Sequence, residues 1–157
     1  MLLTEALFDP SVLALGEAGL DKQIETPMPL QMEVFEAQAR LAEEFGKPMV
    51  IHCVKAWEEL LGIRKLLRPQ MPWVIHGFRG NADLARQLIQ KGIKLSFGQR
   101  YNPEALRMAG ADYIFAETDD AEVSIEEIYA GMAKELDLSI DLLALTLRKN
   151  VRETFSV

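Results

Sequence analysis

The sequence has few of the features that mark secreted, membrane or nucleic-acid-coating proteins. Its one cysteine, Cys53, excludes an internal disulfide and fits a reducing compartment, so we expect a cytoplasmic protein. No apolar run is long enough to span a bilayer and no signal-peptide pattern opens the chain, so we expect no membrane contact. With 17 basic against 24 acidic residues, the net charge of −7 argues against a nucleic-acid coat but allows a local phosphate site.

Short apolar runs and amphipathic segments alternate along the 157 residues, of which 49% are hydrophobic. The runs predict strands at 11–17, 49–53, 73–76, 93–98 and 112–119. The amphipathic segments predict helices at 30–45, 55–68, 82–91, 103–109, 124–136 and from 139 onward. In the helix over 30–45 the apolar side is expected to carry Val34, Ala37 and Leu41. This alternation predicts one α/β domain over residues 1–157, built on a parallel sheet.

The predicted strands end in side chains that can bind a metal. The first ends in Glu17, the second and third in His52 and His76, the only histidines, and the fifth in Glu117 and Asp119. The carboxyl ends of parallel strands meet at one edge, or ring one mouth in an α/β barrel, so these groups should converge. Each residue alone also fits a structural role such as a turn cap. Together, histidine and carboxylate favour a divalent metal such as zinc or manganese.

Three further residues flank these positions. Cys53 should point away from the site if His52 faces it, because side chains alternate along a strand, and a buried inert thiol is the favoured interpretation. Arg79 in the HGFRGN loop and Lys55 after His52 suit an anionic group such as phosphate, although pairing with surface acids fits as well. The chain has no P-loop, dinucleotide fingerprint or nucleophile-elbow serine.

Five motifs in order, GEAGLD, VIHC, VIHGF, LSFG and ETD, resemble the TatD family of metal-dependent hydrolases, and the closing KNVRETF is similar to that family's last element. The resemblance runs from about Ser11 to Phe155. It implies a TIM-like (β/α) barrel with a metal site at its mouth. Glu17, His52, His76 and Asp119 then correspond to metal ligands, with Glu17 bridging the metals and Asp119 orienting or deprotonating the attacking water.

The resemblance also implies the function. Asp119 and Glu17 would be the catalytic residues, Arg79 and Lys55 would bind substrate, and zinc, manganese or magnesium would be the cofactor. The substrate would be DNA or another phosphodiester. Two alternatives stay open: an amide or ester hydrolase on the same metal, and a non-catalytic assembly module with a vestigial site.

One part of the family pattern has no counterpart in the sequence. The family begins with a strand that carries His-x-His, whereas both histidines here are already assigned. We therefore expect an incomplete barrel of about five parallel strands, shortened at its N-terminus, with an open side that another segment or a homo-oligomer could cover. Glu17, His52 and His76 would then hold one metal with water in the fourth position. The affinity of this site for the metal should be reduced, and the hydrolase activity of the chain should be weak or absent.

Overall fold

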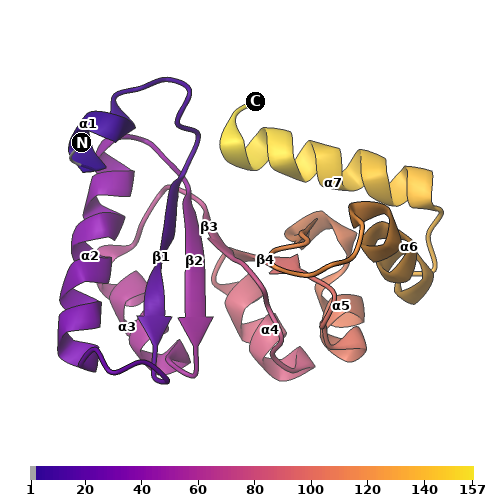
Figure 1. The fold of residues 1–157 in the computed structure, drawn as a ribbon, viewed down its shortest axis with the longest axis horizontal. Helices are drawn as coiled ribbons and strands as arrows, with labels where there is room; N and C mark the ends of the chain where they lie inside the picture. The colour runs from indigo at the N-terminus through magenta and orange to yellow at the C-terminus, as the bar shows by residue number, and fades with distance from the viewer. Residues whose placement is uncertain (1–2) are drawn as a thin grey trace. The chain divides into compact units, whose positions relative to one another are not determined.

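The computed structural model describes residues 3–157, and strands and helices alternate along them (Figure 1). The strands are β1 (Leu15–Asp21), β2 (Met49–Val54), β3 (Trp73–Ile75), β4 (Ile93–Phe97) and β5 (Ile114–Ala116). The helices are α1 (Leu3–Leu7), α2 (Met28–Glu44), α3 (Trp57–Leu67), α4 (Ala82–Gln90), α5 (Pro103–Ala109), α6 (Ile125–Glu135) and α7 (Ile140–Phe155), with a 3-10 turn at Ala111–Tyr113. No helix within residues 3–157 is long and apolar enough to cross a membrane.

The strands follow the order β1-β2-β3-β4-β5 in one five-stranded sheet, and β1 with β2 and β4 with β5 are parallel pairs. The prediction of about five parallel strands with flanking helices is confirmed. Contacts divide the chain into two compact units, residues 1–73 and 74–157, with the boundary inside β3. Whether these units fold as the single predicted domain stays a prediction.

In the first unit, α2 packs on β1 and α3 on β2. Phe35 of α2 and Trp73 of β3 are fully buried and meet edge to face, with ring centroids 5.4 Å apart. Val34 is 49% exposed, so its expected place on the apolar side of α2 is wrong, and the neighbouring Phe35 faces the core instead. The larger ring of Phe35 takes the core-facing position because it removes more apolar surface from water than valine does.

The expectation that the first strand ends at Glu17 is wrong. Strand β1 continues to Asp21, so Glu17 lies inside the strand. Leu15 pairs with Met49 and Ala18 with Ile51, so Gly16 and Glu17 together face a single residue of β2 in a β-bulge. Gly19 lies inside this strand. A Cβ there would lie 1.8 Å from the His52 carbonyl oxygen, so the glycine permits close approach of the two backbones.

In the second unit, α7 packs on β5 and against α6 (Figure 1). The side-chain amide of Asn150, in the closing KNVRETF segment, donates hydrogen bonds to the carbonyls of Ala111 and Ile114 at 2.8 and 2.9 Å. Asn150 is 2% exposed, so these bonds satisfy a buried polar group and fix the start of β5 against α7. The fifth strand is shorter than expected, because residues 111–113 form a 3-10 turn and pairing stops at Ala116.

Candidate functional site

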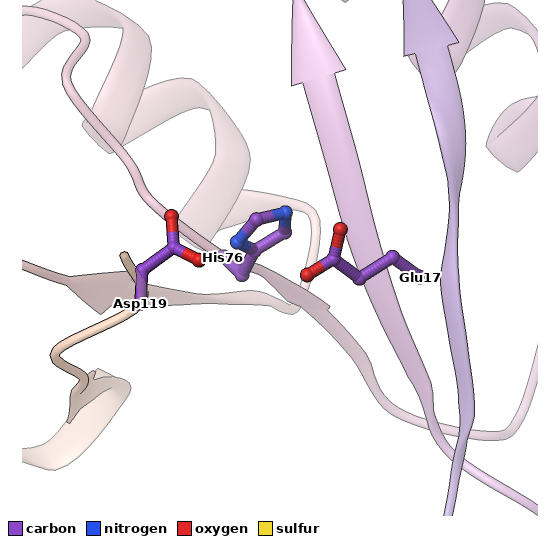
Figure 2. Close-up of side chains that lie close together, drawn as sticks. All are labelled: Glu17, His76 and Asp119. Carbon is purple, nitrogen blue, oxygen red and sulfur yellow. The ribbon is translucent and has the colours of Figure 1, made fainter. Parts of the chain in front are cut away.

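His76 and Asp119 approach each other in the second unit. His76 directly follows β3, and Asp119 lies three residues after β5 with a left-handed backbone, φ 50°. Figure 2 shows both side chains turned toward the same space, and a ring nitrogen of His76 lies within 4.8 Å of an Asp119 carboxylate oxygen. Two ligands that each lie about 2.1 Å from one ion are at most roughly 4.2 Å apart, so a small side-chain movement would let both bind the same ion.

Glu117 adds a second carboxylate beside His76. Its Oε1 lies 3.6 Å from His76 Nδ1. Glu117 Oε1 is buried and accepts no hydrogen bond within the described residues. A buried carboxylate oxygen is costly without a partner, and a cation would supply one. The donor set of imidazole nitrogen and carboxylate oxygen therefore fits a divalent metal.

A cavity of about 390 Å³ opens beside these residues, entirely within the second unit. Its charged lining residues are the basic Arg79 and Arg100 and the acidic Glu117, Asp119, Asp120 and Glu122. Within residues 3–157 neither arginine forms an ion pair with a carboxylate, although four carboxylates share the cavity with them. The guanidinium groups are therefore available for an anion, and guanidinium matches phosphate in geometry and charge.

The first unit holds His52, which pairs with a residue that the sequence analysis did not single out. His52 Nε2 lies 3.2 Å from Asp21 Oδ2, at the end of β1. The pKa of Asp21 is lowered, first by a hydrogen bond from the Gln23 amide and further by His52 and Lys55. Lys55 is exposed and has a left-handed φ of 56°, and its positive charge acts on Asp21.

Glu17 and Cys53 also belong to the first unit. The bulge in β1 leaves Glu17 exposed between the buried Leu15 and Ala18, and Figure 2 shows its side chain extending from β1. Cys53 is buried as expected, and its burial raises the pKa of the thiol to about 12. The thiolate is therefore scarce near neutral pH, and the interpretation of an inert cysteine is supported.

Each unit thus brings together part of the predicted set. The second unit gathers His76, Asp119 and Arg79, and the first gathers His52 and Lys55. Asp21 and Arg100 were missed, and Glu117 was named among the strand-end carboxylates without a role of its own. Asp21 stands at a strand end in the quoted motif GEAGLD, a signal that could have found it. Arg100 follows β4 with no motif around it.

Comparison with known proteins gives a consistent picture. A family model described as TatD related DNase matches residues 2–156. The human protein named 3′-5′ RNA nuclease TATDN2 is 37% identical over 129 residues, covering 74% of this chain and 17% of that protein. An Edwardsiella piscicida protein named 3′-5′ ssDNA/RNA exonuclease TatD is 37% identical over 83 residues, covering 52% and 32% respectively.

An uncharacterized metal-dependent hydrolase of Haemophilus influenzae is 28% identical over 139 residues, covering 80% of this chain and 53% of that protein. The chain therefore spans between about a sixth and about a half of the length of these three relatives. The crystal structure of YjjV, a TatD homologue from Escherichia coli, superposes with a TM-score of 0.85 at 23% identity, covering 99% of this chain and 69% of that one. This likeness shows a shared fold and confirms the fold prediction.

Proposed function

Because the chain belongs to the TatD related DNase family, we propose that it is a metal-dependent hydrolase of phosphodiester bonds in single-stranded nucleic acid. Relatives named as 3′-5′ nucleases of RNA or single-stranded DNA support the substrate class. The observation that carries the proposal is the cavity that Asp119 and Glu117 share with two arginines. The cavity offers carboxylate oxygens as ligands for a cation and guanidinium groups for phosphate.

The proposed ligands of a zinc, manganese or magnesium ion are Glu17, His52, His76 and Asp119, as the family resemblance implies. When bound, such an ion lowers the pKa of a water molecule and neutralises charge on the scissile phosphate. Asp119 then accepts, at a carboxylate oxygen, the proton that the attacking water loses. Arg79 binds a non-bridging phosphate oxygen and holds the substrate in line, and Lys55 attracts the anionic chain to the site.

The proposal includes a cellular compartment and an oligomeric state. The single cysteine is compatible with the reducing cytoplasm, where we place the protein. A homo-oligomer that covers the end strands β1 and β5 is also part of the proposal, because strand edges without a neighbour favour pairing between chains.

Asp119→Asn tests the role of Asp119 without disturbing the backbone, because asparagine also tolerates the left-handed conformation observed there. The wild-type chain should shorten a 5′-labelled single-stranded DNA or RNA oligonucleotide slowly, and only when manganese, zinc or magnesium is added. The D119N variant should lose about a hundredfold or more of that rate, since proton transfer by a positioned side chain contributes roughly 10²–10⁴-fold.

The matched control is Asp120→Asn, which removes a neighbouring carboxylate of the same cavity that has no assigned role. D120N should retain the rate within a few-fold. Equal losses in the two variants would remove Asp119 from the mechanism. Cleavage of a cyclic amide but of no oligonucleotide, with any of the three metals, would overturn the phosphodiester proposal in favour of an amide hydrolase.

A further inference from the structure

The segment Gln99–Tyr101, which follows β4, separates two adjoining cavities of the second unit. The first is the 390 Å³ cavity described above, which Gln99 and Arg100 line. The second measures about 290 Å³ and is lined by Gln99, Tyr101, Val123, Glu127, Ile128 and Gly131. Gln99 belongs to both linings, so the cavities are neighbours along one short stretch of chain.

The two cavities differ in chemistry. The first carries the guanidinium groups of Arg79 and Arg100, which form no ion pair within the described residues. The second has an aromatic ring and two aliphatic side chains among its six lining residues, and its only charged residue is Glu127. Glu127 is held in place, because its Oε2 accepts a hydrogen bond of 3.0 Å from the Ser124 amide. Its negative charge disfavours phosphate in the second cavity, whereas the first cavity offers two guanidinium groups alongside its four carboxylates.

The Tyr101 ring is held in a defined position on the wall of the second cavity. It stands edge to face on Phe97, with ring centroids 6.4 Å apart and planes at 89°. Gly131 of α6 leaves the space beyond it open, since a Cβ at that position would stand 3.3 Å from the Tyr101 hydroxyl oxygen. A fixed aromatic ring beside an open space is a surface on which a nucleobase can stack, because every base has a π-face.

We propose that the two cavities form one nucleotide subsite, with phosphate bound by Arg79 and Arg100 and the attached base held against Tyr101. Each nucleotide of a single strand joins a charged phosphate to a flat base. The first cavity offers guanidinium groups for the phosphate, and the second offers an aromatic ring for the base. The inference rests on the proposed function for its substrate class. It adds two recognition residues, Arg100 and Tyr101, and assigns the second cavity to the base.

Ligand binding in the absence of added metal tests the subsite apart from hydrolysis. Calorimetric titration should compare inorganic phosphate, 2-deoxyribose 5-phosphate and deoxyadenosine 5′-monophosphate on the 157-residue chain. The nucleotide should bind at least about fivefold more tightly than the sugar phosphate, the lower end of what one base–aromatic stack contributes. The Arg100→Gln variant should weaken all three ligands by a similar factor.

Gly131→Leu is the decisive variant, because it fills the second cavity from a helix that accepts leucine more readily than glycine. In G131L the preference for nucleotide over sugar phosphate should fall below about twofold, while sugar phosphate binds as in the wild type. If thermal unfolding shows that G131L is destabilised, Tyr101→Leu serves as the test in its place. Leucine keeps apolar bulk against Phe97, and the preference for nucleotide over sugar phosphate should again fall below about twofold.

Equal affinities for the two ligands in the wild-type chain would overturn the inference, and so would a nucleotide preference that survives in a folded G131L or Y101L. Neither result depends on bond cleavage. A chain that binds nucleotide in this way and cleaves nothing would therefore keep the subsite and reject the proposed hydrolase. Failure of the subsite would leave the proposed hydrolase standing.

Discussion

At the residue scale, the contact between His52 and Asp21 determines how His52 can serve a metal. An ionised carboxylate only accepts hydrogen bonds, so at 3.2 Å His52 Nε2 must carry the hydrogen that Asp21 Oδ2 accepts. Neutral His52 then carries the lone pair on Nδ1, the nitrogen that a metal would use. Asp21 is therefore a positioning residue for a proposed ligand, as carboxylates often are for metal-binding histidines.

Replacing Asp21 with alanine should release His52 from this tautomer. Because the chain has two histidines, ¹⁵N NMR of the imidazoles at pH 8 reads His52 directly, with His76 as the internal reference. Wild-type His52 should be the Nε2–H tautomer, and D21A should show a mixture. Zinc affinity should fall about tenfold or more in D21A, the usual effect of losing such a partner.

The matched variant is Asp21→Asn, whose amide oxygen still accepts a hydrogen bond. D21N should keep the wild-type tautomer and most of the zinc affinity. Two results would remove Asp21 from this role: an Nδ1–H tautomer of His52 in the wild type, or an Nε2–H tautomer that persists unchanged in D21A.

At the element scale, periodicity and capping residues located every helix between residues 28 and 155. Ser124 and Glu127 form a capping box: Ser124 Oγ accepts a hydrogen bond from the Glu127 amide, and the Glu127 carboxylate accepts one from the Ser124 amide. Boundaries of strands were less predictable. Strand β1 continues past Glu17, where Gly19 permits close pairing, and pairing alone decided where β5 stops.

The capping box predicts a measurable contribution to stability. Ser124→Ala should lower the free energy of unfolding by about 1 kcal/mol, within the range of roughly 0.5–2 kcal/mol seen for such caps. Urea denaturation measures it. The control is Thr146→Ala in α7, whose exposed hydroxyl bonds only to the Leu142 carbonyl one turn earlier, and it should change stability by less than about 0.5 kcal/mol. An unchanged urea midpoint in S124A would contradict the prediction.

At the scale of the whole molecule, the boundary between the two compact units falls within one three-residue strand. Trp73 begins β3 and packs on Phe35 in the first unit, while Ile75 ends β3 buried in the second. One end of so short a strand cannot lose its structure without disturbing the other. This continuity is the physical reason to expect the units to unfold together, as the single-domain prediction requires.

Two probes test this expectation, because both tryptophans, Trp57 and Trp73, lie in the first unit. Tryptophan fluorescence then follows the first unit, whereas far-UV circular dichroism follows helices of both. The urea transitions from the two probes should coincide, as they do for a cooperative single domain. A fluorescence transition completed at lower urea than the circular dichroism transition would show that the units are separate domains.

The sequence by itself determined the order of strands and helices, the parallel sheet and the family, because hydrophobic period, capping residues and ordered motifs are local and survive in one dimension. It also led to the prediction of His76, Asp119 and Arg79 as site residues, from their places after strands. Only the tertiary structure decided which partners these side chains meet. Glu117 comes to lie beside His76, Asp21 beside His52, and Arg100 in the same cavity as Asp119. These arrangements depend on strand register, a bulge and loop geometry, and therefore on packing between segments far apart in the chain.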